Sequence, residues 1–314
     1  MKKKVLILAG GYSKEREISK QTGKEVYKTL KKKYNVKILD PSNKLISNIR
    51  KFKPNVIFNA LHGRFGEDGY IQMLLEQENI KYTHSGILSS YLSMNKDLSK
   101  KIFKNNKIST PKWLKYNFNE KVDNKFISKL NKKIGFPLVV KPVNEGSSVG
   151  VYICNKQNIK KNIRKLKEYD EILIEQYIPG KEIQAAIMGN KKIGAIELIP
   201  TRKFYDYKAK YSKKAKTKHI MPANIPNKYY DKVNNLALKA HKLLKCNGIS
   251  RSDFRFYKNK FFLLELNTQP GMTSLSLVPE IAKHNNISFF NLLDWIVKDA
   301  QKKKIKYKLY FFIL

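Results

Sequence analysis

The chain is short of cysteine, of long apolar runs and of acidic residues. Two cysteines in 314 residues exclude a disulfide framework and a zinc site built on cysteine. No apolar run reaches the roughly 18–20 residues that a membrane-spanning helix needs, so we expect no stable membrane insertion. Asp and Glu number 25 against 64 Lys and Arg, which gives a formal net charge of +39.

Arginine is also scarce, because only seven of the 64 basic residues are arginine. A strong positive charge suggests nucleic acid or an anionic membrane surface as partner. A dedicated nucleic-acid reader is expected to use more arginine, which forks onto phosphate and guanine. The lysines instead form short runs along the whole chain, such as 31–33 and 302–304. We therefore favour a lysine-rich composition without a specific nucleic-acid partner, and leave weak, salt-sensitive DNA binding open.

The N-terminus imitates a secretory signal, with lysines at 2–4 before an apolar run at 5–9. Five apolar residues fall below the about 7–15 of a signal core, so a buried first strand explains the run better. Cys154 and Cys246 lack neighbours of the CxxC kind and fit a reducing compartment. The sequence predicts a cytosolic protein.

Strands and helices alternate in the first part of the chain. Apolar runs at 5–9, 36–39 and 56–60 predict strands. An apolar repeat every four residues over 18–30 predicts a helix, and a second helix is predicted over 70–78. Alternation of this kind indicates a parallel sheet covered on both faces. We expect an N-terminal α/β domain over residues 1–94.

The remainder predicts mixed α+β structure, so the fold class is α/β and α+β multidomain. A central unit is expected over 95–178, a C-terminal unit over 179–301, and a basic then apolar tail of unknown role over 302–314. The predicted helices of this part span 88–106, 156–169, 228–245 and 288–299. The predicted strands span 136–141, 151–154, 172–176, 182–188 and 192–199, followed by a hairpin.

The predicted hairpin lies at 251–267, where polar and apolar residues alternate. Side chains alternate between the two faces of a strand. One face should belong to a core and consists of Phe254, Phe256, Phe262, Leu264 and Leu266. A three-residue loop over 258–260 would place Phe254 opposite Leu264 and keep these residues on one face.

The other face of the hairpin carries Arg251, Asp253, Glu265 and Asn267. The same register sets Asp253 opposite Glu265, with Cβ atoms about 5 Å apart. Two carboxylates and an amide oxygen suit Mg²⁺ or Mn²⁺. The alternative is a solvated polar face on which Arg251 and Arg255 act as counter-ions.

Three loops are candidates for binding phosphate or an oxyanion. Lys141 precedes a loop of small residues over 145–150, which lets backbone N–H groups approach phosphate oxygens, although a plain turn is the alternative. The segment 204–211 is rich in aromatic and basic residues and suits either a lid over an anion or a basic surface loop. The loop 270–273 is placed to offer backbone N–H groups to a developing oxyanion.

Eight segments follow one another in a recognisable order: 10–19, 60–63, 66–69, 93–96, 141–150, 204–211, 251–253 and 265–277. In that order they resemble the ATP-grasp superfamily and, within it, the D-alanine–D-alanine ligase family. The resemblance spans about residues 4–300 and departs at Asn95, where the family usually has Asp. It implies an ATP-grasp fold with an N-terminal parallel α/β domain.

The resemblance also implies a reaction. ATP phosphorylates the carboxylate of one D-alanine, and the amine of a second attacks the acyl phosphate to give a dipeptide for peptidoglycan. It implies ATP as co-substrate, two Mg²⁺ or Mn²⁺ ions and a homodimer. The alternatives are another acceptor, such as D-lactate or D-serine, or a basic nucleic-acid-binding protein on an ATP-grasp body. Tyr211 favours the dipeptide, because ester-forming relatives often carry Phe there.

Residue roles follow from the motif positions. Glu15 would hold the ammonium of the first alanine and hydrogen-bond with Ser147 and Tyr211, and His62 would lie near that substrate. The residues expected to contact ATP are Lys96, Lys141 and Lys210 at the phosphates, and Glu175 and Glu182 at the adenine and ribose.

The metal ligands implied by the resemblance are Asp253, Glu265 and Asn267. Arg251 and the Gly271 N–H would stabilise the tetrahedral intermediate. The backbone N–H groups of Ser276 and Leu277 would bind the carboxylate of the second substrate.

Overall fold

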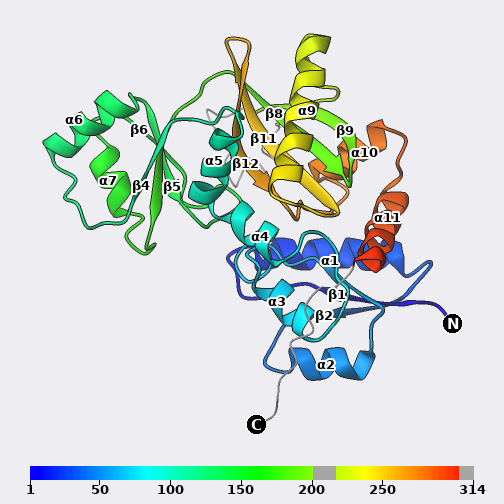
Figure 1. Ribbon diagram of the computed structural model, residues 1–314. Coiled ribbons are helices and arrows are strands. Elements are labelled where there is room, and N and C mark those ends of the chain that lie inside the picture. Colours follow the sequence, from blue (N-terminus) through cyan, green and yellow to red (C-terminus); the bar gives the residue numbers. More distant parts are fainter. Residues whose placement is uncertain (201–216, 304–314) are drawn as a thin grey trace.

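The computed structural model describes residues 1–200 and 217–303, and these form three sheets (Figure 1). The first is parallel, in the order β2-β1-β3, as predicted. Its strands are β1 (Lys4–Leu8), β2 (Asn35–Leu39) and β3 (Val56–Asn59). The helices of this part are α1 (Arg16–Leu30), α2 (Leu45–Phe52) and α3 (Tyr70–Gln77).

The central strand β1 is buried on both faces of this sheet. Leu6 and Leu8 point into a core with residues of α2 and α3, whereas Val5 and Ile7 point into a core that also contains residues of α1. This arrangement follows from the alternation of side chains in a strand. The four-residue repeat predicted for α1 is confirmed, because Ile18, Thr22, Val26 and Leu30 are all buried.

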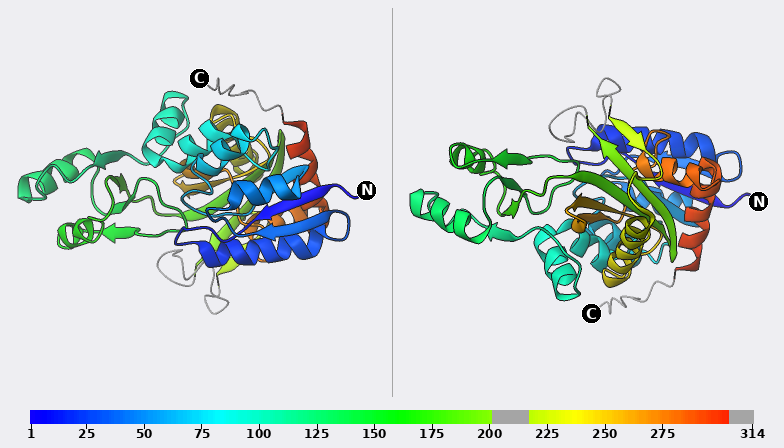
Figure 2. Two further views of the ribbon diagram at one scale, coloured as in Figure 1. Left: turned by 90° about the horizontal axis from the view of Figure 1, so that it is seen from below. Right: turned by 90° about the horizontal axis from the view of Figure 1, so that it is seen from above.

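The second sheet is antiparallel, in the order β4-β7-β5-β6, and projects away from the rest of the molecule (Figure 2). Its strands are β4 (Trp113–Tyr116), β5 (Leu138–Pro142), β6 (Tyr152–Cys154) and β7 (Ile172–Gln176). The helices beside it are α6 (Asn124–Lys133) and α7 (Ile159–Arg164). The helix predicted over 156–169 is therefore shorter than expected.

The third sheet is antiparallel, in the order β10-β9-β8-β11-β12. Its strands are β8 (Lys181–Met188), β9 (Lys191–Ile199), β10 (Lys218–Ile220), β11 (Ile249–Tyr257) and β12 (Lys260–Asn267). One face packs against α9 (Asn227–Leu243) and α5 (Lys96–Asn105). The other packs against α10 (Leu277–His284) and α11 (Phe289–Lys302), in the core that also holds β1.

The single helix predicted over 88–106 is wrong. The chain forms α4 (Ile87–Met94) and α5, with a break at Asn95, whose backbone is extended (φ −82°, ψ 98°). The Asn95 side chain accepts a hydrogen bond from the Leu98 N–H and so caps α5. Asn is among the favoured N-cap residues, which explains why an asparagine fits here in place of the usual aspartate.

Each of the ranges 1–94, 95–178 and 179–301 contains one sheet, and we keep them as proposed domains. Their cores are not separate, however. Phe103 and Ile108 of the second range lie in the core of the third sheet, and α11 packs against α1 and β3 of the first. Among the described residues, no helix has both the length and the apolar character to cross a membrane.

Candidate active site

Two adjoining cavities bring together most of the predicted residues that the structure describes. The sheet cavity lies between the second and third sheets and is lined by β5, β7, β8, β11, β12 and the loop 143–151. The loop cavity is lined by the start of α1, the loop 268–277 and the start of α10. Lys96, Glu145 and Glu265 line both, so the two cavities meet at these residues.

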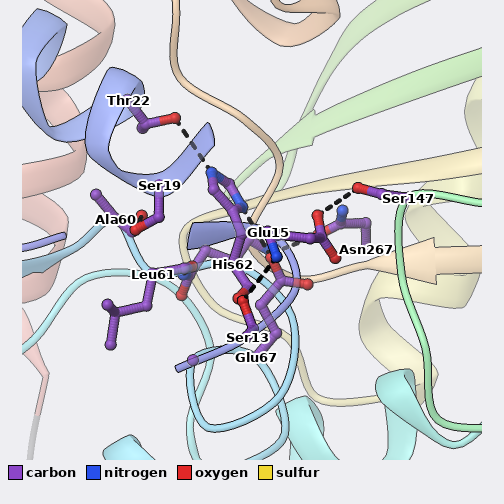
Figure 3. Close-up of polar contacts among 12 residues, drawn as sticks. Ser13, Glu15, Ser19, Thr22, Ala60, Leu61, His62, Glu67, Ser147 and Asn267 are labelled. Carbon is purple, nitrogen blue, oxygen red and sulfur yellow. Dashed lines mark hydrogen bonds and ion pairs between the residues drawn. The ribbon is translucent and has the colours of Figure 1, made fainter. Parts of the chain in front are cut away.

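Glu15 lies in the loop cavity, directly before α1, and is 5% exposed. Ser147 donates a hydrogen bond to its carboxylate (Figure 3), as the resemblance implies. Glycine at position 146 gives the Glu15 carboxylate room, because a Cβ atom there would lie 2.7 Å from Glu15 Oε1 and would displace that side chain. Ser147 and Ser148 both have positive φ angles, 48° and 59°, a conformation that is uncommon outside glycine and costs energy. The loop is thus held in a strained form that reaches Glu15.

His62 is buried next to this pair, in the loop that follows β3 and beside α1 (Figure 3). Its Nδ1 lies 2.9 Å from Glu67 Oε1 and its Nε2 lies 3.2 Å from Thr22 Oγ1. Burial alone lowers the pKa of His62, but the contact with Glu67 and the charge of Glu15 outweigh it and raise the pKa. The raised pKa favours the protonated, cationic form of His62 beside Glu15.

The predicted opposition of Asp253 and Glu265 across β11 and β12 is confirmed. The predicted three-residue turn is wrong, because Tyr257 pairs with Lys260 and leaves the two-residue turn Lys258–Asn259. Both turn residues have positive φ angles, 46° and 60°, as a type I′ turn requires. Such turns match the twist of a hairpin better than the looser loop that we predicted.

A β-bulge reconciles the tight turn with the Asp253–Glu265 pair. The register shifts between Asp253 and Phe254, so that Phe254 pairs with Leu263 and Leu264 has no directly opposed residue. Phe254 and Leu266 lie in the core as predicted, with Phe256 packed partly against it, but Phe261 and Leu263 take the places we assigned to Phe262 and Leu264. Leu264 instead lines the sheet cavity.

The polar face of the hairpin is closely paired within the protein. Arg251 donates hydrogen bonds to both carboxylate oxygens of Asp253, at 2.7 and 3.0 Å. Glu265 Oε2 lies 3.7 Å from Lys96 Nζ, and Asn267 Oδ1 accepts a 2.7 Å hydrogen bond from the Gln269 N–H. The three predicted metal ligands therefore lie together with counter-ions beside them.

Lysines from two elements converge on the sheet cavity. Lys96 begins α5 and donates a hydrogen bond to the Glu145 carbonyl. Lys141 of β5 forms a 2.5 Å ion pair with Glu175 of β7. The side chains of Lys96, Lys141 and Glu175 are nearly inaccessible to solvent. Burial lowers the pKa of Lys96. Buried cations of this kind favour an anionic ligand.

Glu182 also reaches the sheet cavity, from the start of β8. Its carboxylate lies 3.1 Å from an Arg255 guanidinium nitrogen, across the register pair of β8 and β11. Arg255 is therefore the partner of Glu182, whereas Asp253 and its neighbour Arg251 pair with each other.

The loop after β12 lies at the far wall of the loop cavity, where Gly271, Ser276 and Leu277 line it. Ser276 precedes α10, and its Oγ accepts a 3.0 Å hydrogen bond from the Thr273 N–H. Leu277 begins the helix, where the first backbone N–H groups have no partner within the helix. The Ser276 N–H, by contrast, donates a 2.9 Å hydrogen bond to the Thr273 carbonyl, so the Leu277 N–H at the helix start is the better placed of the two predicted donors to bind a carboxylate.

The chain is similar to known proteins of one family. The family described as "D-ala D-ala ligase C-terminus" matches residues 102–298. A D-alanine–D-alanine ligase of Pelagibacter ubique is 59% identical over 301 residues, covering 96% of this chain and 99% of that protein. The chain belongs to the D-alanine–D-alanine ligase family.

Two further members of the family are similar to this chain over nearly its whole length. The D-alanine–D-alanine ligase of Wolbachia pipientis wMel is 44% identical, covering 96% of this chain and 95% of that protein. The crystal structure of the D-alanine–D-alanine ligase from Bacillus anthracis complexed with ATP matches with a TM-score of 0.83 and 31% identity, covering 95% and 97% of the two chains. The predicted ATP-grasp fold is thereby confirmed.

Two residues expected from the family resemblance, Lys210 and Tyr211, lie outside the described residues. The sequence analysis also missed several residues that hold the site. Lys100 is fully buried beside Glu175, and Gln269 hydrogen-bonds with Leu61 and Asn59 of the first domain. For Lys100 the sequence does carry a signal, because it lies four residues after Lys96 and so on the same face of a helix. We find no such signal for Gln269.

Proposed function

We propose that this protein joins two D-alanines to D-alanyl-D-alanine at the expense of ATP. The observation that carries the proposal is the junction of the two cavities at Lys96, Glu145 and Glu265. A nucleotide in the sheet cavity would present its phosphates to a substrate in the loop cavity. The names of the relatives support this assignment.

The first step is phosphoryl transfer to the first D-alanine. An oxygen of its carboxylate attacks the γ-phosphorus of ATP, ADP leaves, and an acyl phosphate forms. Glu15, held by Ser147, binds the ammonium group of this substrate. Lys96 and Lys141 bind the phosphates, together with Lys210, and Glu175 and Glu182 bind the adenine and ribose.

The second step forms the peptide bond. The amine of the second D-alanine attacks the acyl carbon, phosphate leaves, and the amine loses a proton. Arg251 and the Gly271 N–H stabilise the negative oxygen of the tetrahedral intermediate, as preorganised donors do in acyl transfer. The N–H groups of Ser276 and Leu277 bind the carboxylate of the second alanine.

Two Mg²⁺ or Mn²⁺ ions form part of the proposal. The all-oxygen set of Asp253, Glu265 and Asn267 fits these ions, although Arg251 and Lys96 already offset part of the charge of the two opposed carboxylates. The described residues contain no group of three or more His, Cys, Asp and Glu side chains placed to hold a metal, so the set depends on the Asn267 amide. When bound, the ions would offset negative charge on the transferred phosphoryl group.

A homodimer and a cytosolic location complete the proposal. Large exposed apolar side chains lie on α3 (Tyr70, Met73) and on α4 (Leu88, Tyr91). The two helices contact each other. Exposed apolar patches often mark interfaces, and a second copy of the chain is the partner we propose.

The cysteines bear on the proposed cytosolic location. Both are free and buried, as is usual in the reducing cytosol.

The test is phosphate release from ATP and Mg²⁺ in the presence of D-alanine, of L-alanine or of no amino acid, with the product mass measured alongside. We expect release with D-alanine only, together with the mass of D-alanyl-D-alanine. ATP turnover without that product would contradict the acceptor assignment and favour D-lactate or D-serine. Loss of D-alanine-dependent phosphate release in the Tyr211→Phe variant would count against an ester product, such as the one formed with D-lactate. A folded protein that shows no turnover, yet binds duplex DNA with sequence preference, would favour the nucleic-acid alternative.

A further inference from the structure

Lys100 is a buried cation that the proposed reaction does not use. Its side chain is fully buried on α5, one turn after Lys96. Its ammonium donates a 2.7 Å hydrogen bond to Thr110 Oγ1 and lies 5.7 Å from the centre of the Trp113 ring. A buried ammonium is costly unless it is paired, so its anchoring at this position calls for a partner of opposite charge.

That partner is Glu175, whose two carboxylate oxygens are shared between two lysines. Lys100 Nζ lies 2.8 Å from Oε2 and Lys141 Nζ lies 2.5 Å from Oε1. The sheet builds this arrangement, because Val139 of β5 pairs with Glu175 of β7. Lys141, two residues further along β5, then points to the same face as Glu175.

We propose that Lys100 is a positioning residue of the nucleotide site: by sharing Glu175, it leaves Lys141 with positive charge for the ATP phosphates. A single carboxylate cannot neutralise two lysines, so the Lys100–Glu175–Lys141 triad carries an excess of one positive charge. Without Lys100, Glu175 would pair with Lys141 alone and cancel its charge. The inference rests on the proposed binding of ATP in the sheet cavity.

The charges around the triad agree with an excess of positive charge. Burial and the charge of Lys141 lower the pKa of Lys100 and outweigh Glu175 and Glu265, which raise it, so that the pKa is about 8. Burial raises the pKa of Glu175, yet Lys100 and Lys141 outweigh burial and lower that pKa. A bound polyphosphate would therefore supply the missing negative charge and stabilise the triad.

The experiment compares Lys100→Met with Lys101→Met by measuring the dissociation constants of ATP and of adenosine calorimetrically. Lys101 is the matched control, because it is the next lysine in the chain but its side chain is 58% exposed and pairs with Asp97. We expect Lys100→Met to weaken ATP binding at least about tenfold and adenosine binding by less than about twofold. Lys101→Met should leave both constants within about twofold of wild type.

A double variant separates charge sharing from a merely structural role. In Lys100→Met/Glu175→Gln the remaining lysine has no carboxylate to neutralise it. We expect the ratio of ATP to adenosine affinity to return toward the wild-type value, even if adenine contacts weaken both constants. Thr110→Val, which removes only the hydroxyl that holds Lys100, should lower the ratio in the same direction but less, and serves if Lys100→Met does not fold.

Equal losses for ATP and adenosine in Lys100→Met, or no recovery of the ratio in the double variant, would overturn the inference. Wild-type protein that binds ATP but makes no dipeptide would refute the proposed reaction and leave the role of Lys100 intact. Wild-type protein that binds no nucleotide would refute both.

Discussion

At the scale of single residues, the polar face of the hairpin illustrates what a sequence can and cannot establish. Alternation in β11 and β12 was enough to predict that Asp253 opposes Glu265, because a slip by one residue would expose the apolar face. Alternation could not reveal that Arg251 occupies both oxygens of Asp253. Nor could it identify Lys100, since burial of a lysine depends on partners that lie 75 residues away in the chain.

The first prediction concerns Glu265. Replacing it by glutamine keeps the shape of the side chain but removes the charge that would bind a cation opposite Asp253. We expect Glu265→Gln to lower ligation turnover at least about a hundredfold, with little change in melting temperature, since the residue is only half-buried. Turnover of the dipeptide and thermal unfolding would be measured side by side.

Glu168→Gln is the control for this change, because the Glu168 side chain is 62% exposed and pairs only with Lys14 among the ion pairs described. That variant should keep wild-type turnover. Full activity in Glu265→Gln would exclude Glu265 as a required metal ligand.

At the scale of elements, the predicted strands and helices were mostly correct in type, and the errors have local causes. A helix was expected to run through Asn95, because the apolar pattern continues on both sides, but the side-chain cap on Leu98 N–H starts a new helix there. The hairpin turn was too long by one residue, because a bulge within β12 cannot be read from alternation alone. Strands β4 and β10 and helices α2, α6 and α10 were missed, since none of them has a long apolar pattern.

The second prediction concerns the attachment of α11 to the turn between α1 and β2. Asp294 of α11 lies 2.6 Å from the Tyr34 hydroxyl and 2.8 Å from Lys33 Nζ. Burial raises its pKa, but hydrogen bonds from Lys298, Lys33 and Tyr34 outweigh burial and lower the pKa to about 2. A lowered pKa stabilises the folded state above the unfolded value near 4, and this stability is lost as the pH falls through 2.

We therefore expect Asp294→Asn to lower the free energy of unfolding by about 1–2 kcal/mol at pH 7. The difference from wild type should fall to about half at pH 3. Urea unfolding at both pH values measures it. Asp231→Asn, on the exposed surface of α9, should cost less than about 0.5 kcal/mol. A difference for Asp294→Asn that grows toward low pH would contradict the assigned ion pairs.

At the scale of the whole molecule, the sequence predicted three sheet-bearing parts but not that they share cores. Periodicity shows which face of an element is apolar and is silent on which distant element covers it. The core around Val5 and Ile7 also contains Ile196 of β9 and Leu293 of α11. The net charge, in contrast, is a property of the whole chain and could be taken from composition alone.

The third prediction concerns that charge. A surface rich in scattered lysine should bind duplex DNA only through phosphates, so binding should be weak, steeply salt-dependent and independent of sequence. Fluorescence anisotropy with two unrelated duplexes should give affinities within about twofold of each other at low salt. Binding should be lost near about 200 mM salt. A consistent preference for one duplex at physiological salt would revive a specific nucleic-acid partner.

The position of α11 has a consequence for the order in which the protein matures on the ribosome. The parallel sheet is made from the first 59 residues, yet the helix that packs against α1 and β3 ends at Lys302. At a synthesis rate of about 5–20 residues per second, that helix follows the sheet by more than roughly 10 s. During this interval the apolar face formed by Val5 and Ile7 lacks part of its cover, and nascent-chain chaperones have a defined surface to occupy.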